Sequence, residues 1–75
     1  MYGMTTPDIC VRFGQRLQRA RKKKGMEQID LAVAAKLTRN YISQIENGKQ
    51  EACLRTIEKL ATGLGVSLSQ LFRGV

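Results

Sequence analysis

The sequence predicts an all-α domain of five short helices, and three observations lead to this fold class. Apolar residues recur every three or four positions in several segments, which is the spacing of a buried helix face. Residues that start helices, such as Asp8, Thr38 and Ser67, stand at the borders of those segments. The length of 75 residues and the hydrophobic share of 43% are those of one small globular domain. We expect a leader at 1–7 and one domain at 8–75.

The first helix is expected over residues 8 to 24. Pro7 and Asp8 form a helix start signal, and Gly25 ends the helix. The inward stripe consists of residues three or four positions apart, namely Ile9, Phe13, Leu17 and Ala20. Gly14 lies off that stripe and is expected only to lower the stability of the helix.

Basic residues are concentrated on this first helix. Seven Lys or Arg residues lie between Arg12 and Lys24, with no acid among them. The whole chain has 13 Lys and Arg against 6 Asp and Glu, a net charge of +7. So basic a small domain favours a polyanionic partner, either nucleic acid or an anionic membrane surface. The alternative is a solvated basic face, which repulsion between neighbouring like charges makes less favourable.

Two short helices separated by a three-residue turn follow. The first is expected over Gln28–Ala35, with its inner face made of Leu31, Ala32 and Ala35. The turn is Lys36-Leu37-Thr38, with Leu37 buried. Thr38 caps the next helix, which closes at Gly48. This arrangement is a helix-turn-helix pattern, in which the second helix enters the major groove of DNA.

The second helix of this pair has one apolar and one polar side. Ile42 and Ile45 are three positions apart and point into the core. The other side carries four side chains that hydrogen-bond to base edges: Arg39, Asn40, Ser43 and Gln44. Arg suits guanine, Asn and Gln suit adenine, and Ser suits several bases. For this segment alone, the alternative is an ordinary solvated helix face.

The last two helices are expected at about 54 to 63 and 68 to 73. The fourth directs Leu54, Ile57, Leu60 and Ala61 inward, and two glycines, Gly63 and Gly65, surround its end. Ser67 caps the fifth. Apolar residues are too numerous for so small a last element, and we expect a dimer interface formed by Leu64, Leu68, Leu71, Phe72 and Val75. The alternative is that all of these residues close the monomer core.

Other chemistry is poorly supported. The chain has no His, and Cys10 and Cys53 are its only cysteines, so four zinc ligands cannot be assembled. We expect reduced thiols in a cytoplasmic protein, no metal and no cofactor. Without His there is no usual general base at neutral pH, and we expect no enzyme activity. No apolar run approaches the length of a membrane-spanning helix, so no transmembrane segment is expected. We expect DNA, and not a membrane, as the polyanionic partner.

Many residues in fixed order resemble the phage repressor/Cro (XRE-like) helix-turn-helix family. The similar segments include Gly25-Met26-Glu27-Gln28, Leu37-Thr38-Arg39, Tyr41 to Lys49, and Leu64-Gly65-Val66-Ser67-Leu68, and the match covers about residues 9 to 72. The resemblance implies a lambda-repressor-like bundle of five helices that binds double-stranded operator DNA as a homodimer. Arg39 and Tyr41-Ile42-Ser43 look similar to the controller proteins of restriction–modification systems.

The resemblance also implies roles for individual residues. Base reading falls to Arg39, Asn40, Ser43 and Gln44, and phosphate contacts fall to Gln28, Asn47 and Lys49. Beyond the resemblance, we also expect phosphate contacts from Lys36 and Thr38 in the turn. Arg21 and Glu46 match a structural ion pair that ties the first helix to the third. The chain departs from the family at Glu27, where Ser or Thr is usual, at Lys36, where Gly is usual, and at Ala52-Cys53, where Pro-Ser is frequent. A positive φ at Lys36 would cost about 1 kcal/mol.

These observations lead to the hypothesis of a sequence-specific transcriptional regulator on a near-palindromic operator. It would control RNA polymerase by steric hindrance or by direct contact. We expect no ligand-sensing domain, so control would follow protein concentration through dimerisation. The alternative is an antitoxin or another protein-interaction module, whose apolar C-terminal residues contact a different protein. A basic helix on an anionic membrane or RNA would explain the charge but not the capped, polar third helix.

Overall fold

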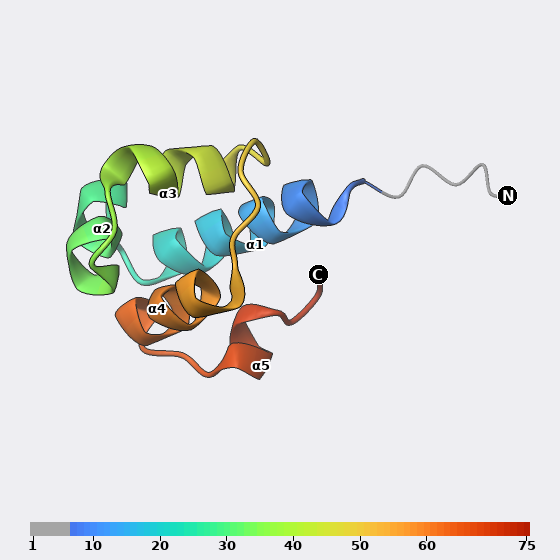
Figure 1. Cartoon of the computed structure of the whole chain (residues 1–75). Coiled ribbons are helices and arrows are strands. Elements are labelled where there is room, and N and C mark those ends of the chain that lie inside the picture. The colour runs from blue at the N-terminus through green and yellow to red at the C-terminus, as the bar shows by residue number, and fades with distance from the viewer. Residues whose placement is uncertain (1–6) are drawn as a thin grey trace, which may run out of the picture.

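A computed structural model describes residues 7–75, and this part of the chain contains five helices and no strand (Figure 1). The helices are α1 (Ile9–Lys23), α2 (Gln28–Ala35), α3 (Arg39–Glu46), α4 (Leu54–Leu64) and α5 (Leu68–Leu71). The predicted all-α fold class is confirmed. The predicted leader at 1–7 lies, apart from Pro7, outside the described residues.

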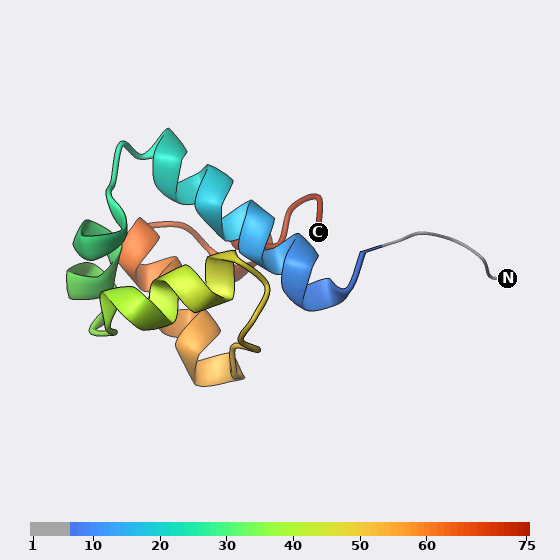
Figure 2. The same cartoon turned by 90° about the horizontal axis from the view of Figure 1, so that it is seen from above.

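Helix α1 lies along one side of the bundle, where it packs against α3 and α5, while α2 packs against both α3 and α4 (Figures 1 and 2). The largest fully buried side chains come from all five helices: Leu17, Leu31, Ile42, Ile45, Leu60 and Leu71. Because every helix contributes to one core, the position of each depends on the others. No helix of the described residues is long and apolar enough to span a membrane.

The first turn of α1 differs from the prediction. Asp8 caps the helix as expected, because its carboxylate accepts a hydrogen bond from the Cys10 N–H at 2.9 Å. Phe13, Leu17 and Ala20 are buried, but Ile9 is 50% exposed. The inward position predicted for Ile9 is therefore wrong, since the first turn of α1 extends beyond the neighbouring helices (Figure 1).

Gly14 lies where α1 crosses α3. A Cβ at this position would collide with the backbone carbonyl oxygens of Ile45 and Glu46, the second at 2.7 Å. The prediction that Gly14 only weakens its helix is therefore incomplete. The missing side chain lets the two helix backbones approach closely, which places the end of α3 against α1.

The segment from α2 to α3 has the predicted form. Leu31, Ala32 and Ala35 are buried, and Leu37 packs against the core from the turn. The Leu37 N–H donates to the carbonyl of Ala32 at 2.8 Å, which closes the end of α2. The second helix of the pair is therefore attached to the first by a short, hydrogen-bonded turn.

Helix α4 begins at Leu54, as predicted, and ends at Leu64, one residue later than predicted. Leu54 is 84% exposed, because it is the first residue of α4 and its side chain lies outside the core, so its predicted inward position is wrong. Leu60 and Ala61 are buried, and Ile57 packs against them from the edge. Gly63 lies inside the helix, where a Cβ would be 3.2 Å from Ala35 Cβ of α2.

Helix α5 is a single turn. Ser67 caps it: its Oγ accepts from the Gln70 N–H at 3.1 Å, and its own N–H donates to Gln70 Oε1 at 2.9 Å. The helix ends at Leu71 rather than at residue 73. Leu71 is fully buried, and the Phe72 ring lies against the Phe13 ring of α1 with a centroid distance of 5.3 Å.

Candidate nucleic-acid interface

Helix α3 has one buried and one exposed side. Ile42 and Ile45 are 0% and 1% exposed and attach the helix to the core. The four residues predicted to read bases lie together on the outer side: Arg39, Asn40 and Gln44 are exposed, and Ser43 is partly buried. These side chains present a guanidinium, two amides and a hydroxyl on two helical turns. This is a donor and acceptor set suited to base edges in the major groove.

Both ends of α3 are fixed by local hydrogen bonds. At the start, Thr38 Oγ1 accepts from the Tyr41 N–H at 3.1 Å. At the end, the Lys49 N–H donates to the carbonyl of Gln44 at 2.9 Å, and Gly48 has φ +73°. Asn47 Nδ2 lies 3.4 Å from Ser43 Oγ. Thr38, Asn47 and Lys49 are thus exposed residues at the two ends of the polar face, where predicted phosphate contacts would flank base contacts.

A buried ion pair links α1 to the end of α3. Arg21 Nε lies 2.6 Å from Glu46 Oε2, and Arg21 Nη2 lies 3.0 Å from Glu46 Oε1. The Arg21 Nη1 group donates to the carbonyl of Met26 at 2.8 Å. The hydrogen bonds to Glu46 raise the pKa of Arg21 against the opposing effect of burial. The structural pair expected between Arg21 and Glu46 is present in the structure.

Gln28 joins this ion pair through a contact that was not expected. Its Nε2 donates to Glu46 Oε1 at 3.1 Å, although the two residues are 18 positions apart. The amide therefore uses one of its two N–H groups within the protein. The remaining N–H and the start of α2, where free backbone N–H groups favour an anion, support the predicted phosphate contact.

A hollow of about 290 Å³ lies beside this cluster. It is lined by Arg21, Lys22, Glu27, Gln28, Ile29 and Arg39. Lys22 was not singled out by the sequence, although it lines this hollow together with Arg21. The exposed amine of Lys22 and the guanidinium of Arg39 bring positive charge to the start of α2, while Glu27 adds one negative charge. The two positive charges outnumber the one negative charge, so the hollow favours an anion such as a phosphate group.

Lys36 occupies the turn in a left-handed conformation. Its φ and ψ are 58° and 44°, and it is the one residue other than glycine with positive φ among residues 7–75. A side chain with a Cβ costs about 1 kcal/mol in this conformation. Lys36 thus has the positive φ considered from the sequence, and this exposed residue lines a hollow with Glu58, Lys59 and Thr62 of α4.

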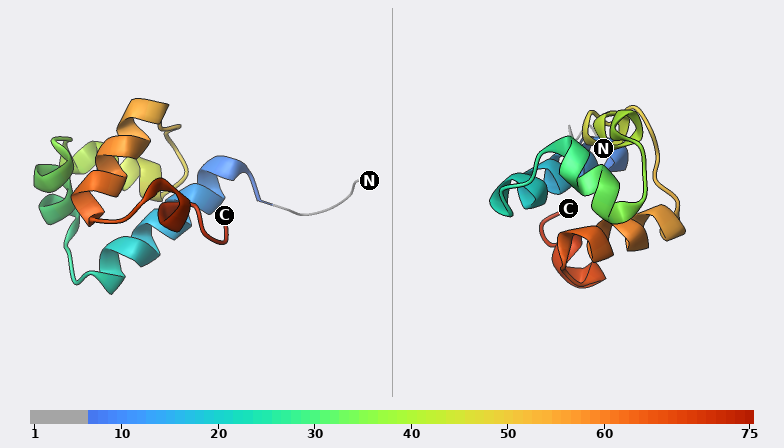
Figure 3. Two further views of the ribbon diagram at one scale, coloured as in Figure 1. Left: turned by 90° about the horizontal axis from the view of Figure 1, so that it is seen from below. Right: turned by 90° about the vertical axis from the view of Figure 1, so that its left-hand side faces the viewer.

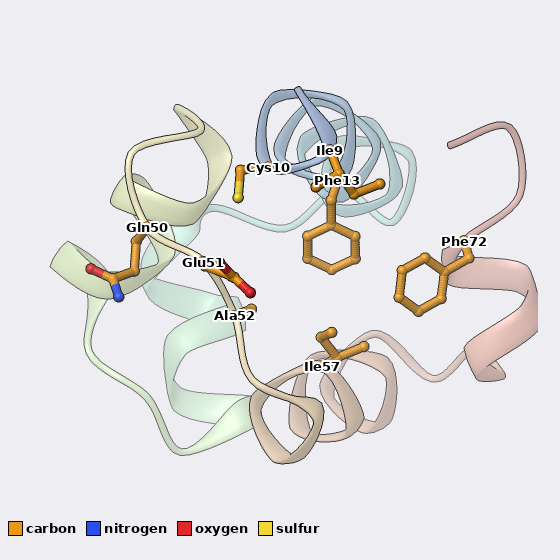
Figure 4. Close-up of a pocket in the computed structure, with 8 residues that line it drawn as sticks. All are labelled: Ile9, Cys10, Phe13, Gln50, Glu51, Ala52, Ile57 and Phe72. Atoms are coloured by element: carbon orange, nitrogen blue, oxygen red, sulfur yellow. The ribbon is translucent and has the colours of Figure 1, made fainter. Parts of the chain in front are cut away.

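An apolar patch is exposed where the starts of α1 and α4 meet α5. It consists of Ile9, Leu54, Ile57, Leu68 and Phe72, of which Leu54 is 84%, Ile9 50%, Leu68 48% and Phe72 39% exposed. Figure 4 shows Phe13, Phe72, Ile9 and Ile57 around a hollow of about 200 Å³ at its centre. The sequence did not identify Ile9 and Leu54 as surface residues, because their helical spacing alone predicts that they point into the core.

The predicted dimer interface needs correction at two positions. Leu64 and Leu71 are only 3% and 0% exposed, because they fill the monomer core between α4, α5 and the other helices. Their side chains are closed off from a second copy of the chain. Leu68 and Phe72 remain exposed, and Val75 is partly buried.

Comparisons with known proteins agree with this geometry. The helix-turn-helix family profile HTH_3 matches residues 17–71. Control protein C.MunI from a Mycoplasma species is 44% identical over 69 residues, covering 91% of this chain and 93% of that protein. Control protein C.BamHI from Bacillus amyloliquefaciens is 40% identical over 67 residues, covering 88% and 83%.

A solved structure is similar throughout the fold. The restriction-modification controller protein C.AhdI from Aeromonas hydrophila superimposes with a TM-score of 0.82 at 41% identity. The match covers 84% of this chain and 96% of that one. These similar proteins are controllers rather than enzymes, in agreement with the expectation drawn from the sequence.

Proposed function

The chain belongs to the helix-turn-helix family of DNA-binding regulators, and on that premise we propose that it reads a specific operator with α3. Arg39, Asn40, Ser43 and Gln44 make the base contacts. The observation that supports this proposal most directly is that these four polar side chains share one face of α3. The residues of its opposite face, Ile42 and Ile45, are only 0% and 1% exposed. A helix fixed in this way holds its side chains in register with successive base pairs.

Phosphate contacts surround this reading face in the proposal. They come from Gln28 at the start of α2, Lys36 and Thr38 in the turn, Asn47 and Lys49 after α3, and Lys22 at the end of α1. Lys36, Lys49 and Lys22 supply positive charge, so they make affinity depend on salt. The uncharged contacts orient the protein on the duplex.

The proposed functional unit is a homodimer formed through the apolar patch. Large apolar side chains gathered on one surface of a small domain are typical of an interaction site. Residues 47–53 lead from the end of α3 to the start of α4, so the patch lies near the end of the reading helix (Figure 2). A two-fold axis beside the patch would set two α3 helices about 34 Å apart along a near-palindromic operator.

The finer role proposed is that of a controller in a restriction–modification system, acting in the cytoplasm where operator DNA is found. Support comes from C.AhdI, a restriction-modification controller protein that matches 84% of this chain, and from the control proteins C.MunI and C.BamHI, which match 91% and 88% of it. Occupancy of the operator would rise steeply with protein concentration, because dimers must form before two half-sites are filled. The bound dimer would then block or contact RNA polymerase.

Selection from a pool of random duplexes tests this proposal. The purified chain is mixed with the pool, bound duplexes are recovered and sequenced, and the cycle is repeated. Enrichment of one two-fold symmetric sequence is the expected result. A chain that enriches no sequence, yet captures a protein partner through Leu54 and Phe72, would favour the antitoxin or interaction-module alternative instead.

A further inference from the structure

A second basic surface lies away from α3. A hollow of about 370 Å³ separates the second half of α1 from α5 and the loop before it. Its rim carries four cationic side chains, those of Arg16, Lys23, Lys24 and Arg73. None of the described residues that line this basic groove is Asp or Glu. The concentration of positive charge calls for an anionic occupant.

Arg16 links the two walls of the basic groove. Its Nη2 donates to the carbonyl of Gln70 in α5 at 2.7 Å. Its Nε is buried and has no hydrogen-bond partner among residues 7–75. A backbone carbonyl, and no carboxylate among the described residues, accepts from this guanidinium, so its charge remains available to an acidic group.

The position of the groove separates it from the DNA-reading face. Helix α1 contacts α3 on one side and α5 on another, and Figure 3 (left) shows α5 lying over α1 on the side turned away from α3. A duplex bound along α3 therefore leaves the groove open. A second DNA duplex is too wide to enter a hollow between two helices, so it would lie across the opening of the groove without filling it.

The lining of the groove suits a slender acidic chain. Ala20 and Val66 give it apolar walls between the cations. An extended peptide can place carboxylates on Arg and Lys while an aliphatic side chain contacts the apolar walls. A free phosphate would use the charges and leave the apolar walls uncovered.

We propose that the basic groove binds an acidic segment of a protein partner, with Asp or Glu side chains on Arg16, Lys23, Lys24 and Arg73 and an apolar side chain against Ala20 and Val66. This inference goes beyond the proposed function, since it requires neither an operator nor a dimer. It gives the regulator a protein-binding surface that stays accessible while α3 is on DNA.

Titration of the full chain with the acetylated peptide Glu-Leu-Glu-Glu-Leu-Glu, followed by ¹⁵N NMR, tests the inference. The largest shifts are expected at Ala20, Val66, Gln70 and the Arg16 Nε–H. Lys23→Glu and Arg73→Glu should each weaken peptide binding about fivefold. Lys59→Glu, the same charge change on an exposed residue of α4 that does not line the groove, should have a smaller effect.

Three results would overturn the inference. The first is the absence of binding by a chain that circular dichroism shows to be folded. The second is an equal loss in the Lys23, Arg73 and Lys59 variants, since that would indicate net charge alone. The third is a loss of DNA affinity in Lys23→Glu and Arg73→Glu that exceeds the loss of peptide affinity, since the groove would then belong to nucleic acid.

Discussion

The guanidinium of Arg21 and the carboxylate of Glu46 form a two-point contact at 2.6 and 3.0 Å, and both residues are 6% exposed. This single pair connects α1 to the last residue of α3, and Gln28 of α2 donates to the same carboxylate. The orientation of the reading helix against its two neighbours therefore depends on this buried charge pair as well as on the packing of Ile42 and Ile45.

Breaking this pair should be costly. Glu46→Leu leaves the Arg21 charge buried without its partner, so we expect the free energy of unfolding to fall by about 3–5 kcal/mol. Urea denaturation measures the change. The double variant Arg21→Met/Glu46→Leu should recover most of the loss, because neither charge then remains buried. A single variant as stable as the wild type would contradict the account.

Lys36 offers a test of backbone strain. Lys36→Gly should raise the free energy of unfolding by about 1 kcal/mol over that of Lys36→Ala, because glycine adopts positive φ without a Cβ penalty. The two variants lack the same amine, so their difference isolates the backbone. Thermal denaturation measures that difference, and equal midpoints for the two variants would show that the turn is not strained.

Local sequence cues were sufficient for much of the fold. The bounds of α2 and the caps at Thr38 and Ser67 follow from residue type and spacing, and these are properties of short segments. Periodicity identifies a side of a helix but not how far its neighbours extend. For that reason Ile9 and Leu54 were wrongly placed inside.

Tertiary contacts explain what the sequence left out of the site. The polar face of α3 follows from helical spacing, since all four residues belong to one short segment. The role of Gly14 depends on where α1 crosses α3, and the Gln28–Glu46 hydrogen bond joins separate helices. The burial of Leu64 and Leu71 likewise depends on how completely the core closes around α4 and α5.

DNA-binding measurements should distinguish residues that contact bases from residues that contact phosphates. Gln44→Ala should lower discrimination at particular base positions by about 1–3 kcal/mol and leave the salt dependence unchanged. Lys49→Ala should weaken binding to all sequences and reduce the slope of log K against log salt by about 1. Fluorescence anisotropy over a salt series measures both. If Gln44→Ala weakened binding to all DNA sequences equally, Gln44 would not be a base-reading residue.

The two thiols should differ in reactivity. Thr56 Oγ1 lies 3.3 Å from Cys53 Sγ, and this hydrogen bond lowers the pKa of Cys53. Desolvation raises the pKa of Cys10, and Asp8 adds to that effect. Because the thiolate is the reactive form, Cys53 should be alkylated first below about pH 9, and the difference should shrink at higher pH.

Peptide mass spectrometry after brief treatment with iodoacetamide measures the two rates. Thr56→Val, which removes the hydroxyl and keeps the shape, should slow the labelling of Cys53 and leave Cys10 unchanged. Faster labelling of Cys10 than of Cys53 in the wild type would refute the assignment.

The apolar patch predicts which variants lose self-association. Leu54→Glu places a charge on the most exposed patch residue, so it should yield folded monomers. Phe72→Glu should also yield monomers but with lower stability, since the ring of Phe72 contacts Phe13. Val33→Glu is the matched control, because Val33 is 72% exposed on α2 outside the patch. Size-exclusion chromatography distinguishes these outcomes, and an unchanged dimer in Leu54→Glu would exclude the patch as the interface.

Sedimentation equilibrium on the selected operator tests the central claim most directly. The chain is titrated onto the symmetric duplex and onto a duplex of equal length with one half-site scrambled. The account predicts two protomers on the symmetric duplex and markedly weaker binding to the scrambled one, with both effects lost in Leu54→Glu. Saturation at one protomer, with equal affinity for the two duplexes, would contradict a homodimer that reads two half-sites with α3.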